Sequence, residues 1–401
     1  MNKKIKNINV IFGSNNFDEI SNMKPFPSFD NKVTGFLDKF SKTLMSEPNI
    51  RDYPEVATLG FFCRSANIKK IKRNYPDSRY LIGRGLAFHI CPSNVPVNFG
   101  YSMVAALLSG CRSILKVSSK EFIQVDIICN ALKKASNERK YSFIKSFISI
   151  IRYNNEKEIN TYLSKKCNVR IIWGGDETVS KVREEGIKPN TTELTFPNKN
   201  SILVIGTKNY LKIKDKIKIA KDFYNDTYLY DQNACTSPRL VYWLGNKSEV
   251  ENAKSIFWEE LNKIIINMKY DLETKIILNK HYNISEVGIE LESVKIKNFN
   301  NFLSIATLNT LDRDIEKYFK GAGLFFEYSD SKIDHLNNFI SDRIQTVSYV
   351  GFSEKQLFDM FIKKPNFGID RIVPVGRTGE FSLKWDGFDL IRHMTREINL
   401  K

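Results

Sequence analysis

The sequence predicts an α/β protein with two domains. Short β-type apolar runs alternate with helical patterns over about residues 81–206, as is typical of parallel sheets covered by helices. Within this region, residues 81–117 contain a strand, a loop, a helix and a further strand, which is the connection that parallel strands require. At 401 residues the chain is long enough for two hydrophobic cores.

The first half supplies most of the elements on which this prediction depends. Residues 33–44 carry a one-sided apolar pattern and predict a helix. Residues 81–90 contain a β-type run, and residues 101–108 are apolar on nearly every face, which predicts a buried helix. Ser109-Gly110 is a typical helix end, and residues 113–117 predict the next strand.

The pattern continues to the end of the chain. Residues 169–173 predict a strand that leads into Gly174-Gly175, and the helix expected next has acidic residues in its first turn, which suit the helix dipole. Ser248-Glu-Val-Glu251 predicts a capping box at a helix start. Further strands are expected at 202–205, 240–244, 322–327, 344–350 and 396–400, and further helices at 121–134 and 213–224.

The stretch 230–240, Tyr-Asp-Gln-Asn-Ala-Cys-Thr-Ser-Pro-Arg-Leu, places Cys235 in a polar loop between a helix and an apolar strand. Such a loop is held by rigid elements and stays reachable from a cleft. Most free cysteines are buried structural residues, and the spacing alone favours that interpretation slightly. The competing interpretation is a nucleophile that accepts an acyl group as a thioester.

Asn94 is a candidate donor to a reacting carbonyl oxygen. It lies between Pro92 and Pro96 at the carboxyl end of a predicted strand, which is the edge where open α/β sheets bind ligands. A short, rigidly held amide there can stabilise an oxyanion. The structural alternative is an Asx-type turn between the two prolines. When Asn94 is considered without the rest of the chain, this alternative is favoured.

A second group of candidates could hold a cofactor. Lys116 closes a predicted strand, and Ser118 and Ser119 follow it, a set that suits ribose hydroxyls or a phosphate. The alternative, a surface lysine beside solvated serines, is commoner. Gly174-Gly175 allows backbone to approach a diphosphate at a helix amino terminus, or simply meets the geometry of the turn. Each signal is weak alone, and their order along successive strands favours the cofactor interpretation.

The charge balance does not identify a partner. Lys+Arg total 61 against 45 Asp+Glu, so the formal net charge is +16, which suits an acidic partner such as a nucleotide or a phosphate carrier. The lysines are scattered and form no dense basic block or nucleic-acid motif. A solvated basic surface is therefore the favoured explanation, and we expect no nucleic-acid partner.

The six cysteines lack C-x-x-C spacing and only four histidines are present, so no zinc or other metal site is expected. Isolated cysteines in a chain of this size indicate a reducing compartment. The amino terminus lacks the apolar core of a signal peptide, and no apolar run is long enough to span a bilayer. The expected location is the cytoplasm.

Eight segments between about residues 81 and 390 carry a family resemblance, and the Gln-Asn-Ala-Cys-Thr-Ser-Pro motif is the most specific of them. They are His89–Val97, Leu108–Gly110, Leu115–Lys120, Ile172–Glu177, Asp231–Pro238, Arg343–Tyr349, Asp370–Gly376 and Trp385–Gly387. In these segments the chain resembles the LuxC family of long-chain acyl-CoA reductases, the fatty-acid reductase component of bacterial luminescence systems. That family is similar in turn to the aldehyde dehydrogenase superfamily.

The resemblance implies an aldehyde dehydrogenase-like α/β fold with two three-layer domains and a small oligomerisation arm. Residues 1–205 would form a Rossmann-like cofactor-binding domain, in which 70–90 contribute to the arm. Residues 206–375 would form the catalytic domain with Cys235, and 376–401 would return to the cofactor domain and the arm. By the same analogy we expect a homo-oligomer.

The resemblance also implies roles for single residues. Cys235 would accept the acyl group, while Asn94 and the backbone N–H of Cys235 would bind the oxyanion. Wider relatives often carry an acid where Ser119 stands, and its absence suits NADPH, with NADH as the alternative. The expected cofactor contacts are Lys116, Ser118, Ser119, Gly174, Gly175 and Glu327.

The implied activity is the NADPH-dependent reduction of a fatty acyl thioester to the aldehyde, the acyl group coming from CoA or from an acyl-protein synthetase partner. Hydrolytic aldehyde dehydrogenases carry a water-activating Glu, whereas the comparable residues 194–200 have none and Glu193 does not align with it. No histidine lies between residues 90 and 280, so the base that deprotonates Cys235 is left open. The alternatives are a cysteine-dependent acyltransferase or thioesterase without redox chemistry, and a non-catalytic binding protein.

Overall fold

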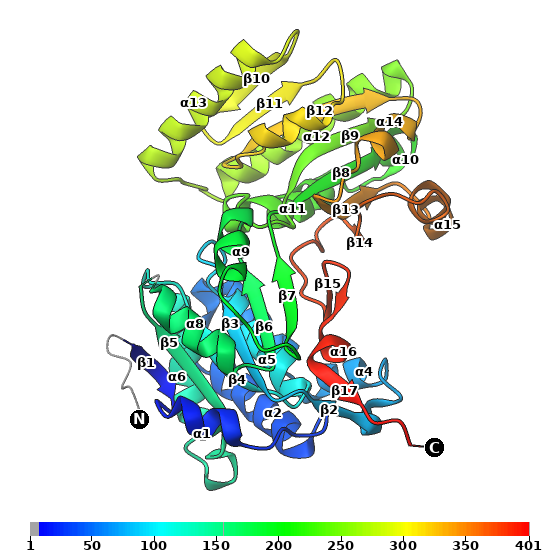
Figure 1. Cartoon of the computed structure of the whole chain (residues 1–401). Coiled ribbons are helices and arrows are strands. Elements are labelled where there is room, and N and C mark those ends of the chain that lie inside the picture. Colours follow the sequence, from blue (N-terminus) through cyan, green and yellow to red (C-terminus); the bar gives the residue numbers. More distant parts are fainter. Residues whose placement is uncertain (1–7, 155, 401) are drawn as a thin grey trace. The chain divides into compact units, whose positions relative to one another are not determined.

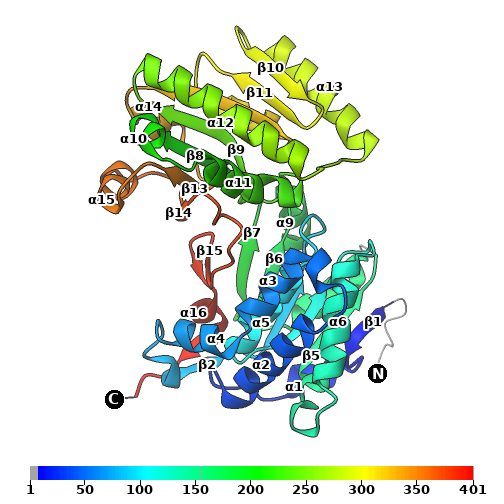
Figure 2. The same ribbon diagram turned by 180° about the vertical axis from the view of Figure 1, so that it is seen from behind.

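The computed structural model describes residues 8–154 and 156–400, which form two compact units (Figures 1 and 2). The first unit contains the described residues up to Pro197 and again from Phe381, and the second unit is Asn198–Glu380. The sequence placed the boundary after residue 205, whereas the division falls before the strand β8 (Asn200–Gly206). None of the described helices combines the length and the apolar character that crossing a bilayer requires.

The first unit is built on a six-stranded sheet in the order β1-β5-β4-β3-β6-β7. Its strands β3 to β7 are parallel and β1 is antiparallel to β5. The chain moves outward from β3 to β4 and β5, and then returns to place β6 on the other side of β3. Open α/β sheets bind ligands at such a reversal, outside the carboxyl ends of the strands. The strands are β1 (Asn9–Gly13), β3 (Leu86–Ile90), β4 (Arg112–Lys116), β5 (Ile148–Arg152), β6 (Val169–Trp173) and β7 (Thr192–Phe196).

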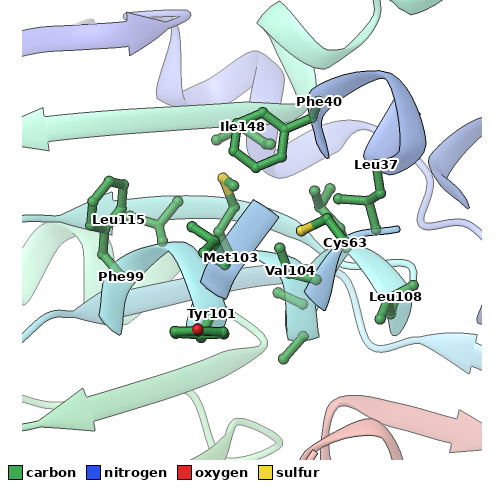
Figure 3. Packing of buried hydrophobic residues seen from close by; sticks show 14 of the residues in the cluster. Leu37, Phe40, Cys63, Phe99, Tyr101, Met103, Val104, Leu108, Leu115 and Ile148 are labelled. Atoms are coloured by element: carbon green, nitrogen blue, oxygen red, sulfur yellow. The ribbon is translucent and has the colours of Figure 1, made fainter. Parts of the chain in front are cut away.

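Helices cover both faces of this sheet. The predicted buried helix is α5 (Asn98–Leu108), and its apolar side chains pack with those of α2 (Asn31–Met45) and with strands β4 and β5 (Figure 3). On the same face lie α3 (Pro54–Phe62), α4 (Ser65–Lys72), α6 (Ile123–Ala135) and α7 (Ile144–Phe147). The opposite face packs against α1 (Phe17–Asn22), α8 (Lys157–Lys166) and α9 (Asp176–Arg183). The unit therefore has three layers.

The carboxyl-terminal residues complete the first unit. The strand β17 (Thr395–Glu397) pairs antiparallel with β2 (Leu81–Gly83), so the segment before Pro92 does pair with the last strand of the chain. The helix α16 (Leu390–Met394) is buried in the main core. Ahead of it, β15 (Lys384–Trp385) and β16 (Phe388–Asp389) form a hairpin whose two turn residues, Asp386 and Gly387, both have positive φ. That β2 and β17 serve as an oligomerisation arm stays a prediction.

The second unit is also three-layered, around a seven-stranded sheet in the order β10-β11-β12-β9-β8-β13-β14. Only the edge strand β10 is antiparallel to its neighbour. The strands besides β8 are β9 (Pro238–Leu244), β10 (Lys295–Asn300), β11 (Leu303–Thr307), β12 (Leu324–Asp330), β13 (Ile344–Val350) and β14 (Arg371–Pro374). One face packs against α10 (Thr207–Lys212), α11 (Lys216–Thr227) and α12 (Lys247–Asn267), and the other against α13 (Thr274–Glu290), α14 (Asp334–Phe339) and α15 (Glu354–Leu357).

Two element starts differ from the prediction. The helix α12 is capped by Asn246, whose side chain accepts from the backbone N–H of Glu249 at 3.0 Å, so the capping box predicted at Ser248 is wrong. Asparagine caps a helix as well as serine does and stands two residues earlier. The strand predicted from residue 322 begins at Leu324, because Ala322 and Gly323 have positive φ values that a strand does not accept.

Candidate active site

Cys235 lies in a sharply turned loop of the second unit. The short 3-10 helix η4 (Tyr228–Tyr230) ends there, and Asp231 and Gln232 both adopt left-handed backbone conformations, with φ of 50° and 60°. Two successive non-glycine residues in this region are strained, so other contacts must hold them. Cys235 is half-buried, as is Cys91, although burial raises the pKa of the Cys91 thiol, whereas Cys63, Cys111, Cys129 and Cys167 are buried. Its exposure does not fit the alternative of a buried structural cysteine.

Gln232 supplies the contacts that hold the turn. Its backbone N–H donates to the carbonyl of Thr227 at 2.7 Å. Its side-chain amide donates to the carbonyl of Pro238 at 2.9 Å and accepts from the backbone N–H of Gly323 at 3.0 Å. Gln232 thereby ties together the two ends of the loop and the start of β12, and its side chain is buried. The loop around Cys235 is therefore fixed rather than pliable.

Two further side chains, one on β8 and one on β9, donate hydrogen bonds to backbone carbonyl groups of the loop. Ser201, on β8, donates to the carbonyl oxygen of Cys235 at 2.7 Å. Arg239, on β9, donates to the carbonyl of Gln232 at 2.9 Å and to the side-chain oxygen of Asn200 at 3.0 Å. These bonds place a guanidinium group under the loop that carries the thiol. The sequence analysis gave Arg239 no role, although it follows the Cys-Thr-Ser-Pro motif directly.

Arg239 is a buried positive charge that no carboxylate of the described residues neutralises. Its Nε is buried and has no hydrogen-bond partner among the described residues. Burial lowers the pKa of the Arg239 guanidinium, and the charge of Cys235 raises that pKa again. Because such an interaction is reciprocal, Arg239 favours the thiolate form of Cys235 over the thiol.

The Cys235 loop lies at the amino-terminal edge of its sheet. Asn200 begins β8, Pro238 begins β9, and Gly323 directly precedes β12. The usual rule for open parallel sheets places ligands at the opposite, carboxyl edge. The sequence motif around Cys235 therefore identified this residue as a candidate. The rule that ligands bind at the carboxyl ends of parallel strands would not have identified it.

The first unit brings the remaining predicted residues, apart from Glu327, to one edge of its sheet. Asn94 is exposed in the loop after β3, Lys116 is the last residue of β4, and Ser118 and Ser119 follow it. Gly174-Gly175 follow β6 and precede α9. Since β4, β3 and β6 are neighbours in the sheet, all six residues lie around the carboxyl ends of adjacent strands, at the reversal of strand order.

Lys116 is held in a partly buried position. Its Nζ lies 5.2 Å from the centre of the Tyr153 ring. Burial lowers the pKa of Lys116, while the charges of Cys91 and Glu185 raise it. The Glu185 carboxyl is itself buried, and burial raises its pKa. A confined amine in such a setting suits a ribose hydroxyl or a phosphate oxygen.

Two details bear on the other cofactor candidates. The hydroxyl of Ser118 accepts from the backbone N–H of Lys120 at 3.1 Å, and Ser119 is exposed. A Cβ on Gly174 would approach the Thr178 side chain to 2.9 Å, so that side chain would have to shift to admit any larger residue at this position. The first turn of α9 carries two carboxylates, Asp176 and Glu177, which would oppose a diphosphate at that helix end.

Glu327 belongs to a buried network inside the second unit. One carboxylate oxygen accepts from the indole N–H groups of Trp243 at 3.0 Å and Trp258 at 2.9 Å. The other accepts from the Thr307 hydroxyl at 2.7 Å and pairs with Lys254 at 3.1 Å. Both oxygens are thus engaged within the protein, and these contacts give no support to the predicted ribose contact. Among the described residues, no His, Cys, Asp and Glu side chains gather in threes to hold a metal ion.

Comparison with protein families gives one match over most of the chain. Residues 64–397 match the model described as acyl-CoA reductase (LuxC). The long-chain acyl-protein thioester reductase of Photorhabdus luminescens is 24% identical over 197 residues, which cover 48% of this chain and 39% of that protein. The protein of the same name from Vibrio harveyi is 20% identical over 307 residues, covering 74% and 60%. The chain thus matches less than two thirds of the length of these relatives.

Solved structures that are similar to this chain include aldehyde dehydrogenases. A lactaldehyde dehydrogenase has a TM-score of 0.65 at 12% identity, covering 96% of this chain and 88% of that chain. Aldehyde dehydrogenase 21 from Physcomitrella patens, solved with succinate, has a TM-score of 0.64 at 12% identity, covering 91% and 84%. At such low identity the likeness shows the fold alone, and it confirms the predicted aldehyde dehydrogenase-like α/β fold.

Proposed function

Because the chain belongs to the LuxC family of acyl-CoA reductases, we propose that it reduces a fatty acyl thioester to the corresponding aldehyde through an acyl group bound to Cys235. The observation that carries the proposal is the half-buried Cys235, held in a fixed, strained loop above the unpaired charge of Arg239. The names of the relatives support an acyl thioester as the substrate class. The donor is acyl-CoA or an acylated synthetase partner.

The first step is acyl transfer to the chain. The Cys235 thiolate, stabilised by Arg239, attacks the carbonyl carbon of the thioester. A new C–S bond forms as the bond to the donor sulfur breaks, and the donor leaves as a thiolate that takes a proton from water. The backbone N–H of Cys235 and the Asn94 amide are the proposed donors to the developing oxyanion. Arg239 thus acts through its charge and accepts no proton, so the thiol proton passes to water and no protein base is assigned.

The second step is reduction. When bound, NADPH, or NADH as the alternative, would supply a hydride to the acyl carbon. The C–S bond to Cys235 would then break, which would release the aldehyde and regenerate the thiolate. Lys116, Ser118 and Ser119 are the proposed ribose and phosphate contacts, because they lie together at the carboxyl edge where this type of sheet binds ligands.

The experiment that tests the acyl-enzyme is intact-mass analysis after treatment with a fatty acyl-CoA, before and after addition of NADPH. We expect one acyl group on the Cys235 peptide, and its discharge as aldehyde in equal amount to the NADPH oxidised. Cys235→Ser should form no adduct, whereas Cys91→Ser, at the other half-exposed cysteine, should form it normally. Acyl release without NADPH oxidation would assign the chain to the acyltransferase or thioesterase class instead.

The cofactor assignment has its own test. Ser119→Glu introduces the carboxylate that repels a 2′-phosphate, so the Kd for NADPH should rise by about tenfold or more while the Kd for NADH does not rise. Fluorescence titration of the reduced cofactor measures both constants, and Ser136→Ala, a change remote from this strand edge in the sequence, serves as a control. An equal loss for both cofactors, or none, would count against the 2′-phosphate assignment.

A further inference from the structure

Arg152 is a second cation beside the strand end that carries Lys116. It is the last residue of β5, and Lys116 is the last residue of β4, the neighbouring parallel strand. The Nε of Arg152 donates to the backbone carbonyl of Ser118 at 3.1 Å. The guanidinium group is therefore bonded to the residue that precedes Ser119, at the edge where this type of sheet binds ligands.

The hydrogen-bonding capacity of this guanidinium group is not filled. Its Nη1 pairs with Glu121 at 3.2 Å, and its Nη2 is buried and has no partner among the described residues. The Arg152 side chain is 13% exposed, whereas that of Glu121 is 86% exposed. An ion pair with one partner so far in solvent contributes little, because water and salt screen it. A stronger anion can therefore displace Glu121.

The charges at these strand ends favour a phosphate group on one side of the sheet edge. Lys116, Lys120 and Arg152 place three cations at the ends of β4 and β5, against the one paired carboxylate of Glu121. On the other side of β3, the first turn of α9 carries two carboxylates, which repel a phosphate. A phosphate dianion carries more charge than a carboxylate and binds arginine through two parallel hydrogen bonds.

We propose that Arg152 binds the 2′-phosphate of NADPH, and that Glu121 competes with that phosphate for the guanidinium group. NADH has a hydroxyl at this position and gains nothing from displacing the carboxylate, so the exchange favours NADPH over NADH. The inference rests on the proposed function, because it assigns two further residues to the cofactor proposed there. The neutral side chain of Ser119 leaves the phosphate unopposed, and Arg152 supplies the charge that attracts it.

Two nucleotide fragments measure this preference without any hydride transfer. Adenosine 2′,5′-bisphosphate carries the 2′-phosphate and adenosine 5′-monophosphate lacks it, and isothermal titration calorimetry of the whole chain gives a Kd for each. The wild type should bind the bisphosphate about tenfold more tightly or better. Arg152→Gln should raise the Kd for the bisphosphate by about tenfold or more and change the Kd for the monophosphate by less than about twofold.

Glu121→Gln should have the opposite effect. It removes the competing carboxylate, so the Kd for the bisphosphate should fall by about threefold or more while the Kd for the monophosphate stays the same. The control is Asp126→Asn, which removes another exposed carboxylate, in the first turn of α6, that is not paired with Arg152 within the described part of the chain. Glu121 and Asp126 are both exposed, so neither change should alter thermal melting.

The outcomes separate this inference from the proposed function. The inference alone is overturned if Arg152→Gln weakens both nucleotides equally, if Glu121→Gln does not tighten the bisphosphate, or if Asp126→Asn tightens it as much. Each of these results leaves the acyl-enzyme and its reduction untouched. If the wild type binds both nucleotides equally, the 2′-phosphate assignment fails, and if it binds neither, the proposed cofactor site fails and this inference with it.

Discussion

At the level of single residues, the charge under Cys235 sets how readily its thiol reacts. Arg239→Gln removes that charge but keeps a donor for the carbonyl of Gln232. We expect the pKa of the Cys235 thiol to rise and its alkylation rate at pH 7 to fall by about threefold to tenfold. Arg239→Lys keeps the charge and should retain most of the rate. Iodoacetamide labelling of the Cys235 peptide across pH, followed by mass spectrometry, measures both effects.

Asn200→Ala is the matched control for this experiment. It removes a neutral hydrogen bond to the same guanidinium group and leaves the charge in place. If Asn200→Ala and Arg239→Gln slow the labelling equally, loop geometry rather than charge controls the thiol. Because alkylation needs neither acyl-CoA nor NADPH, the result is independent of whether the chain is a reductase.

A second residue-scale prediction concerns Glu327. Glu327→Gln removes the charge that neutralises Lys254 and weakens two indole hydrogen bonds inside the second unit. Breaking a buried ion pair by changing one partner lowers the free energy of unfolding by about 3 kcal/mol. Urea unfolding should show this loss, and Lys254→Met added to Glu327→Gln should recover part of it. If Glu327→Gln leaves the free energy of unfolding unchanged but raises the Kd for NADPH, Glu327 would instead be assigned to the cofactor site.

At the scale of elements, one carboxylate joins α11 to the loop after β14. Asp226 accepts from the backbone N–H groups of Gly376 at 2.6 Å and Thr378 at 3.0 Å. Burial raises the pKa of Asp226 to about 6 from an ordinary 3.8, although these two bonds oppose the shift. The folded chain therefore binds this proton more tightly than the unfolded chain does.

This difference in proton affinity makes the free energy of unfolding depend on pH. The stability contributed by the Asp226 proton is complete below about pH 4 and is lost as the pH rises through about 6. Asp226→Asn does not titrate, so the unfolding free energy of the wild type minus that of the variant should fall by at most about 3 kcal/mol from pH 4 to pH 7. Denaturant unfolding at several pH values measures this difference. A difference that is constant or rises with pH would contradict the assignment.

The elements that the sequence predicted well are those whose side chains are compatible with only one kind of secondary structure or degree of burial. The nearly all-apolar run 101–108 can only be buried, and the run 169–173 is rich in β-branched residues and is followed by two glycines. Both are present as α5 and β6. The start of β12 was misjudged because positive φ values at Ala322 and Gly323 depend on tertiary contacts, which local propensity does not report.

The site was predictable in part for similar reasons. The motif identified Cys235, and the strand ends identified Lys116 and Asn94 as residues at one sheet edge. The roles of Arg239 and Glu327 depend on depth below the surface and on partners such as Asn200 and Lys254 that are distant in the sequence. No pattern of spacing encodes those contacts, so only the folded chain reveals them.

At the scale of the whole molecule, the first unit depends on residues from both ends of the described chain. Trp385, Leu390, Ile391 and Met394 are buried in its main core, and β17 covers the edge of β2. A chain truncated before Phe381 should therefore lose hydrogen-exchange protection in β3 and β4, whereas β8 and β9 of the second unit keep theirs. Mass spectrometry of exchanged peptides makes the comparison within a single sample. Equal loss in both sheets would contradict the division into two units.

The same arrangement imposes an order on biosynthesis. The 183 residues of the second unit, Asn198–Glu380, are translated between the two parts of the first. At about 5–20 residues per second, the ribosome needs on the order of 10–40 s to pass through them. Throughout that interval the nascent first unit lacks α16, so the apolar core residues that this helix covers stay exposed. The second unit can therefore finish folding before the first. The residues of the first unit are made earliest, but they are among the last to be protected by complete folding from chaperones and proteases.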